Sequence, residues 1–220
     1  MMRRRGLSAL CCAVVLCAGS GAFGEEFGFV NITGNNPNDA EAGEAQLFFD
    51  VTPAGANEAL FTFFNIGPAA SSITDIYFDD SGFLSLIMID DSEAGVDFSP
   101  GGSPPNLPGG GGVMPPFEAN VDLTISANPP PSSNGVNPGE SVGVVYELGA
   151  GVSFDDLIDA LIGGEDGVNE DLRVGIHVQG FDGGGSESFI GVPDPATGLL
   201  LATATGLLAI ARRRRTRAAR

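Results

Sequence analysis

The chain lacks several residue types on which common functional sites depend. It contains no lysine and no tryptophan, one histidine, and three cysteines that all lie near its start, Cys11, Cys12 and Cys17. Without lysine there is no phosphate-binding P-loop, because the GxxxxGK[ST] motif needs that residue. One histidine is too few for a typical multi-histidine zinc site. The sequence after Cys17 also excludes disulfides, thiolate metal ligands and a cysteine nucleophile.

Positive charge is almost absent from the middle of the chain. All ten basic residues are arginines: three are Arg3–Arg5, six follow residue 211, and Arg173 lies between. All 28 acidic residues fall between Glu25 and Asp194. A surface this negative repels nucleic acid and anionic lipid, attracts cations such as calcium, and favours solubility. Simple solubility outside the cell is the preferred interpretation, ahead of specific cation binding.

Residues 1–24 match a secretory signal peptide. Arg3–Arg5 form the positive n-region, Leu7–Ala18 forms the apolar h-region, and small residues follow. Cleavage after Ala22, or two residues later, fits the small-x-small rule. Cys17 raises a lipoprotein alternative, but a lipobox needs a small residue where this chain has leucine. We therefore expect signal peptidase to remove this segment and the rest of the chain to be exported.

The body, residues 25–191, consists of short β-rich runs separated by glycine and proline. Many short strands with turn residues between them are typical of an all-β antiparallel sandwich, jelly-roll-like or Ig-like, and a barrel or jelly roll is the near neighbour. Phe83–Ile89 is nearly continuous in its hydrophobicity and is predicted to be buried. The predicted strands are Gln46–Thr52, Ala59–Ile66, Ser72–Phe78, Phe83–Ile89, Ala119–Ala127, Ser141–Leu148, Leu172–Phe181 and Ser186–Val192.

One short helix is predicted near residues 154–162. Ser153 and Asp156 have the spacing of a capping box, an apolar face follows them, and two glycines end the pattern. A helix between two strands is expected to cover one end of the sandwich.

Three stretches are predicted to lack regular structure. Ser99–Pro116 is dominated by glycine and proline and cannot form the interior of a strand. Asn128–Pro138 contains three consecutive prolines, which predict a stiff and extended loop. The acidic stretch Asn35–Gly43 is predicted to be mobile.

Two pairs of aspartates flank the predicted strand Phe83–Ile89. Asp79 and Asp80 precede it, and Asp90 and Asp91 follow it. Carboxylate oxygens suit hard cations, so the four are weak candidates for a calcium site. None follows the spacing of a calcium-binding loop. The preferred interpretation is that paired aspartates at strand ends face water. We therefore predict no cofactor, and calcium at these aspartates is the one weak alternative.

His177 is the residue on which a hydrolase would depend. A Ser-His-Asp triad would need it, yet the chain contains no GxSxG nucleophile elbow. A histidine packed or half exposed within a strand is the preferred interpretation. Pairs of carboxylates could serve a glycosidase, but among 28 acidic residues such pairs carry little information. We therefore predict that the protein is not an enzyme and assign no catalytic residues.

The last 29 residues, 192–220, have the layout of a sorting or anchoring signal. Val192-Pro193-Asp194-Pro195 is followed by an apolar run, Gly198–Ala211, and then by the basic residues Arg212, Arg213, Arg214 and Arg215. As a helix the apolar run spans roughly 21 Å, whereas the hydrocarbon core of a bilayer is about 30 Å thick. The run is therefore marginal as a permanent anchor and suits transient insertion. Basic residues after it are expected to stay cytoplasmic.

These residues resemble the PEP-CTERM sorting signal of bacteria. The resemblance covers the motif Val192 to Pro195, the short apolar helix and the arginine cluster, with Asp194 in place of the usual glutamate. It implies recognition and cleavage by an exosortase-type membrane protease, and export to the cell surface or matrix beside exopolysaccharide. A plain single-span anchor is the alternative.

The predicted function is therefore that of an exported structural protein of the cell surface or extracellular matrix. Its expected partners are signal peptidase, an exosortase-type enzyme and exopolysaccharide. A secreted module that binds polysaccharide or calcium is the second interpretation. A single-span anchored surface protein or a hydrolase is the third.

Overall fold

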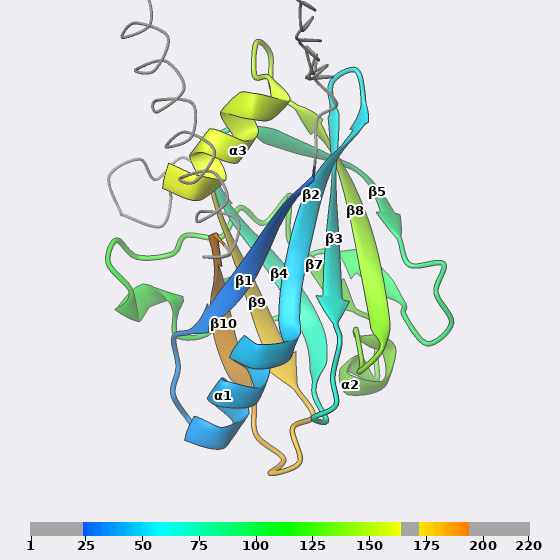
Figure 1. Cartoon of the computed structure of the whole chain (residues 1–220), viewed down its shortest axis with the longest axis vertical. Helices are drawn as coiled ribbons and strands as arrows, with labels where there is room; N and C mark the ends of the chain where they lie inside the picture. The colour runs from blue at the N-terminus through cyan, green and yellow to red at the C-terminus, as the bar shows by residue number, and fades with distance from the viewer. Residues whose placement is uncertain (1–23, 164–171, 194–220) are drawn as a thin grey trace, which may run out of the picture.

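The computed structural model describes residues 24–163 and 172–193, which form a ten-stranded antiparallel sheet with helices at its ends (Figure 1). The fold is therefore all-β and antiparallel, as predicted. The strands follow the order β5-β8-β3-β2-β1-β10-β9-β4-β7-β6. The elements are β1 (Glu25–Asn31), α1 (Pro37–Gln46), β2 (Leu47–Gly55), β3 (Glu58–Asn65), β4 (Ser72–Asp80), β5 (Leu84–Asp90), β6 (Phe98–Pro100), η1 (Gly110–Gly112), β7 (Ile125–Ala127), α2 (Pro131–Asn134), β8 (Glu140–Leu148), α3 (Phe154–Gly163), β9 (Leu172–Gln179) and β10 (Glu187–Pro193).

All ten strands belong to one nearly closed sheet, where the sequence predicted two packed sheets. Each strand between β5 and β6 is hydrogen-bonded to neighbours on both sides. The two edge strands are connected by a short loop, and the backbone N–H of Phe98 in β6 donates to the Asp91 carboxylate at 2.9 Å. Strand twist accumulates across a sheet of this width and curls it. Apolar residues that point inward alternate with outward-facing residues in a sandwich of two sheets and in one curled sheet alike. The alternation in the sequence therefore did not distinguish the two folds.

Aromatic side chains fill the interior of the curled sheet. Phe61 and Phe63 in β3 are fully buried. The Phe61 ring meets Phe78 edge-on at 5.3 Å and Tyr146 at 5.6 Å between centroids. The Tyr146 hydroxyl donates to the carbonyl oxygen of Leu123 at 3.0 Å, which satisfies its polar atom. Aromatic pairs of this kind contribute about 0.5–1.5 kcal/mol each beyond their buried area.

Helix α3 covers one end of the sheet, and its predicted capping box is confirmed. The backbone N–H of Ser153 donates to Asp156 Oδ2 at 2.8 Å, and the N–H of Asp156 donates to Ser153 Oγ at 3.2 Å. The side-chain and backbone hydrogen bonds from Ser153 lower the pKa of Asp156. Leu157 and Leu161 are buried on the face toward the sheet.

Helix α1, at the opposite end, corrects the prediction that 35–43 is mobile. Asn36 caps it by accepting a hydrogen bond from the N–H of Asn38 at 3.0 Å, and Pro37 begins it. The helix has no apolar stripe, and this is why the sequence pattern did not show it. Gly43 is buried against Phe189: an ideal Cβ on this glycine would lie 2.2 Å from the Phe189 ring.

Several further boundaries differ from the prediction. Strand β5 agrees with the predicted bounds Phe83–Ile89 to within one residue. It is, however, an edge strand rather than a buried one, with Ile87 49% and Met88 52% exposed. Only the last three residues of 119–127 form a strand, and Val121 before them is 57% exposed. Strands β1 and β6 were missed, and α2 replaces part of the expected extended loop after Asn128. Pattern reasoning failed here because tertiary neighbours decide which short runs are paired.

Candidate functional site

The predicted sorting motif begins where the described sheet ends. Val192 and Pro193 are the last residues of β10, and Pro193 is paired with Phe27 of β1. Asp194, Pro195 and the basic residues 212–215 lie outside the described residues. Within the described ranges, no helix is long and apolar enough to cross a membrane.

The four candidate calcium ligands are not brought together. Asp80 and Asp90 each accept hydrogen bonds from the turn that follows them, Asp91 accepts from β6, and Asp79 pairs with Arg173. The two pairs flank the seven-residue strand β5, which spans about 20 Å. Among the described residues, no three His, Cys, Asp or Glu side chains are close enough to hold a metal ion. Each carboxylate instead serves its own local contact.

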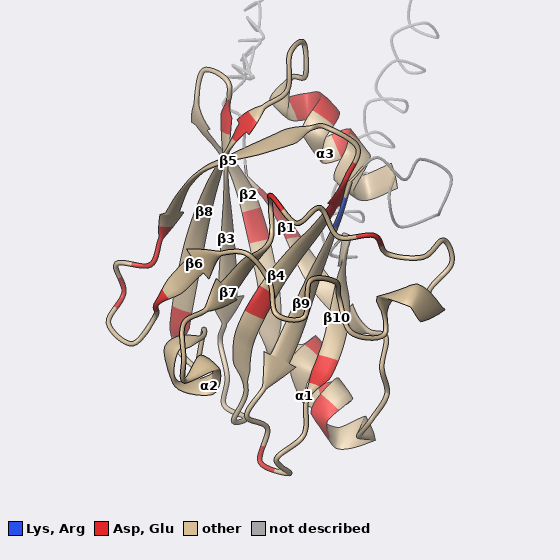
Figure 2. Cartoon of the chain, turned by 180° about the vertical axis from the view of Figure 1, so that it is seen from behind, with Lys and Arg blue, Asp and Glu red and all other residues tan. Residues whose placement is uncertain are grey.

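Arg173 is the one lysine or arginine among the described residues, and it is the blue segment in Figure 2. It attaches the long glycine- and proline-rich loop between β6 and β7 to the sheet. Its Nη1 donates to the carbonyl oxygen of Pro115 at 2.8 Å and its Nη2 to that of Pro116 at 2.6 Å. Nη2 also pairs with the Asp79 carboxylate, and the guanidinium lies 5.4 Å from the centre of the Phe117 ring. Arg173 is 8% exposed. Sequence reasoning noted this residue as an isolated charge but assigned it no role.

His177 lies in a polar row that crosses three strands. Its register partners are Asp75 in β4 and Ser188 in β10, and its Nδ1 is 3.1 Å from Ser188 Oγ. The Asp75 carboxylate accepts hydrogen bonds from Thr74 and Ser126. Burial lowers the pKa of His177, while the negative charge of Asp75 acts in the opposite direction. His177 is 8% exposed and Ser188 is fully buried. The histidine is therefore packed within strand β9.

Glu187 connects β10 to the segment that leads into α1. Glu187 is 1% exposed, and its carboxylate accepts hydrogen bonds from the backbone N–H groups of Asn35 and Asn36, at 3.2 and 2.6 Å. Thr33 Oγ1 and Asn31 Nδ2 donate to it as well. Burial alone would raise the pKa of Glu187, but these hydrogen bonds outweigh burial and lower it.

Replacing Glu187 by glutamine is expected to remove part of the acid sensitivity of the protein. Because the folded-state pKa is lowered, the ionised carboxylate contributes stability above its ordinary pKa of 4.5, and this contribution disappears as the pH falls through the lower folded-state value. The difference in unfolding free energy between wild type and Glu187→Gln should therefore be largest near neutral pH and shrink below about pH 4. Urea titrations across this range measure it. Glu41→Gln, at an exposed position of α1, is the control, and a difference independent of pH would contradict the assignment.

A buried polar network lies where α1 meets the sheet. Gln46 Nε2 donates to Asn65 Oδ1 at 2.9 Å and to Ser71 Oγ at 2.7 Å. Asn65 Nδ2 donates in turn to the carbonyl oxygen of Val136 at 3.2 Å. A buried network with its members satisfied rigidifies the surrounding structure. It holds the segment before β4 in place.

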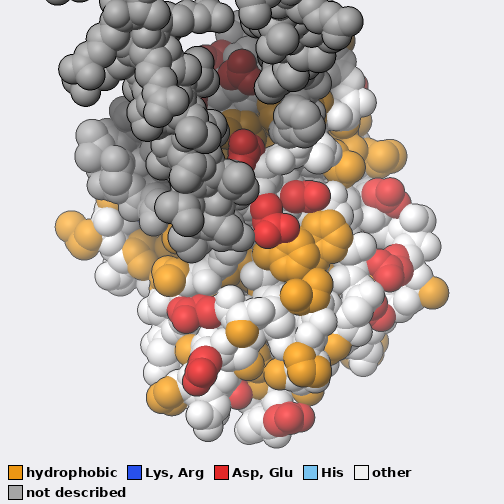
Figure 3. Space-filling view, viewed as in Figure 1, with side chains coloured by type: hydrophobic (Ala, Val, Ile, Leu, Met, Phe, Trp, Pro, Cys, Tyr) orange, Lys and Arg blue, Asp and Glu red, His pale blue; other side chains and the backbone are white. Residues whose placement is uncertain are grey.

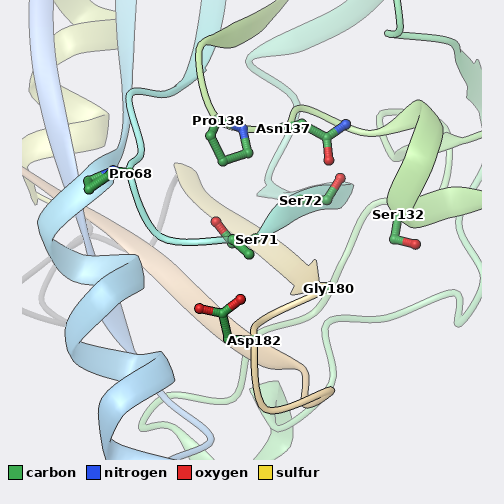
Figure 4. A pocket seen from close by; sticks show the side chains of 9 residues that line it. Pro68, Ser71, Ser72, Ser132, Asn137, Pro138, Gly180 and Asp182 are labelled. Atoms are coloured by element: carbon green, nitrogen blue, oxygen red, sulfur yellow. The ribbon is translucent and has the colours of Figure 1, made fainter.

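A polar cavity of about 440 Å³ lies beside this network (Figure 4). The loop before β4, α2, the loop before β8 and the turn between β9 and β10 form its walls. Sequence reasoning missed it because most of these residues fall in stretches regarded as loops, and no local pattern connects them. The lining residues are Pro68, Ala70, Ser71, Ser72, Ser132, Asn137, Pro138, Gly180 and Asp182.

Comparisons with known proteins found no matching family model, no matching curated protein and no matching solved structure.

Proposed function

We propose that the protein is an exported structural component of a bacterial cell surface or extracellular matrix. The observation that carries the proposal is the order of its segments: a signal-peptide-like start, an acidic body, and a tail that resembles a PEP-CTERM sorting signal. Removal of both ends would leave Arg173 as the only fixed cation against nearly all 28 acidic residues. Figure 3 shows acidic side chains scattered over one face, with no basic side chain visible among the described residues there.

The geometry of β10 supports processing at the tail. Pairing of this strand with β1 extends to Pro193, the second residue of the motif. Cleavage after Pro195 would therefore leave every described strand intact. An exosortase-type enzyme could release or transfer the body without unfolding it.

Ending the chain after Pro195 is expected to leave the stability of the body unchanged. The melting temperature of the truncated protein should agree with that of the protein recovered from cells within about 2 °C. Mass spectrometry of the recovered protein should show that the residues after Pro195 are missing. An intact tail in the envelope fraction would contradict sorting and favour a permanent anchor. A chain ended after Phe189, within β10, is the control, and it should lose stability because its pairing with β1 is broken.

A further inference from the structure

We infer that a groove on the outer face of the sheet receives the apolar and basic tail of the same chain, residues 198–215. The groove has a volume of about 450 Å³ and lies over β1 and β2, beside the end of α1. The inference goes beyond the proposed function, because it concerns where the tail lies before any cleavage. The tail itself lies outside the described residues. The inference rests on the apolar lining of the groove, on the point where the described chain leaves the sheet, and on charge.

The walls of the groove are largely apolar. Phe48 lines it from β2 and stacks on Phe64 of β3 at 4.7 Å between ring centroids. Ile66, which follows β3, also lines it and is 60% exposed. Gly28 leaves open space on the β1 side, because a Cβ on this glycine would meet nothing within 4 Å. Figure 3 shows apolar side chains grouped over β2 and β3. Covering exposed apolar side chains is favourable in water, so an apolar segment fits this surface.

The described chain leaves the sheet beside the groove. Val192 of β10 is a lining residue and the register partner of Gly28. The apolar run begins at Gly198, and the five residues 193–197 between them reach at most about 17 Å. Pro195 and Gly198 favour the turn that would bring the chain back over the sheet. A segment tethered this closely has an effective concentration in the millimolar range, so weak contacts hold it.

The length of the run matches the length of the strand beside it. As a helix the run extends about 21 Å, and the seven-residue strand β1 extends about 23 Å. Because β10 is antiparallel to β1, Pro193 leaves the sheet toward Glu25. A run that turns back there and follows β1 ends level with Asn31. The backbone N–H of Asn31 donates to Glu44 of α1 at 2.9 Å, so the arginines after residue 211 would arrive beside Glu44.

The charge of the groove suits this arrival. Glu26 and Glu44 are its two charged lining residues, and Asp50 is the register partner of Glu26. Helix α1 has no basic residue in its last turn, so nothing in α1 offsets the partial negative charge of its C-terminus. The tail carries six of the ten arginines of the chain. A second copy would instead bring two acidic surfaces together, and an anionic membrane would be repelled.

Hydroxyl-radical footprinting with mass spectrometry tests the inference on the full-length chain. Phe48 and Ile66 should be modified about threefold more slowly than in a chain ended after Pro195, which corresponds to a groove covered in about two thirds of the molecules. Met114 and Val121, on the loop between β6 and β7, are the internal controls. They are 89% and 57% exposed and should be modified equally in both chains.

Two variants of the tail separate the apolar from the charged contribution. Leu207→Asp combined with Leu208→Asp should remove the protection of Phe48 and Ile66. Replacing Arg212–Arg215 by glutamine should weaken the protection, and raising the salt concentration should weaken it in the unmodified chain, because exposed charges are screened. All of these substitutions lie outside the described sheet, so the body keeps its fold in each variant.

Three results would overturn the inference. The first is equal modification of Phe48 and Ile66 in the full-length and the shortened chain. The second is protection that persists without the tail, which would assign the groove to another occupant. The third is protection that disappears on about tenfold dilution, because a contact within one chain does not depend on concentration. The mass of the protein recovered from cells tests sorting, so docking and sorting can fail separately.

Discussion

Phe61→Ala is expected to lower the free energy of unfolding by about 3–5 kcal/mol. The ring is fully buried at the centre of the curled sheet, in contact with Phe49, Phe78 and Tyr146. Its removal leaves a cavity that the surrounding strands cannot collapse into, because each is held by hydrogen bonds on both sides. Urea denaturation followed by circular dichroism measures the loss.

Phe64→Ala is the matched control for this prediction. It removes the same side chain from the same strand, but on the opposite, half-buried face, where Phe64 stacks on Phe48 at 4.7 Å. We expect a loss of about 1 kcal/mol from it. If the two variants were equally destabilised, the interior would not be the dominant source of stability.

Arg173→Ala is expected to cost about 3 kcal/mol of unfolding free energy and to release the loop between β6 and β7. The substitution leaves the carbonyl oxygens of Pro115 and Pro116 without their donor. The Asp79 carboxylate keeps only the hydrogen bond from the backbone N–H of Glu118. Removing one partner of a buried ion pair costs about 3–5 kcal/mol, and the lower end applies because the Asp79 side chain is 17% exposed. Urea denaturation measures the stability, and chymotrypsin should cut the released loop at Phe117.

Arg173→Lys separates charge from geometry. Lysine keeps the positive charge but cannot reproduce the planar fork that reaches both carbonyl oxygens and the carboxylate. The free energy of unfolding of Arg173→Lys should therefore lie between those of the wild type and of Arg173→Ala. A loop that resists chymotrypsin in Arg173→Ala would show that Leu107 and Phe117, packed on Tyr77, hold it without the arginine.

Local patterns predicted those parts of the fold that depend on neighbours in sequence. The capping pair Ser153 and Asp156 was found because its hydrogen bonds span three residues. Seven of the predicted strands agree closely with observed ones. The predicted runs begin at Gln46, Ala59, Ser72, Phe83, Ser141, Leu172 and Ser186, and the strands are β2, β3, β4, β5, β8, β9 and β10. Helix α1 escaped detection because it is held by polar contacts and by the glycine under Phe189 rather than by an apolar stripe.

The candidate site could not be predicted in the same way. Ser72, Asn137 and Asp182 come from three segments that are far apart in the chain and meet only in the folded protein. The paired aspartates beside β5 were visible in the sequence as candidate calcium ligands. In the structure they accept hydrogen bonds from nearby backbone N–H groups, and one of them forms an ion pair with Arg173. A pattern of acidic residues shows which side chains are available, but their contacts decide what each one does.

The sequence by itself determined the antiparallel all-β class, the acidity of the body and the layout of the two ends. These depend on composition and on short-range periodicity, which the order of residues contains in full. Only the tertiary structure decided that ten strands form one curled sheet, that Arg173 attaches a long loop, and that a cavity with an unsatisfied Ser72 lies beside α2. The reason is that each of these depends on contacts between distant segments, and on which groups remain unpaired once those contacts have formed.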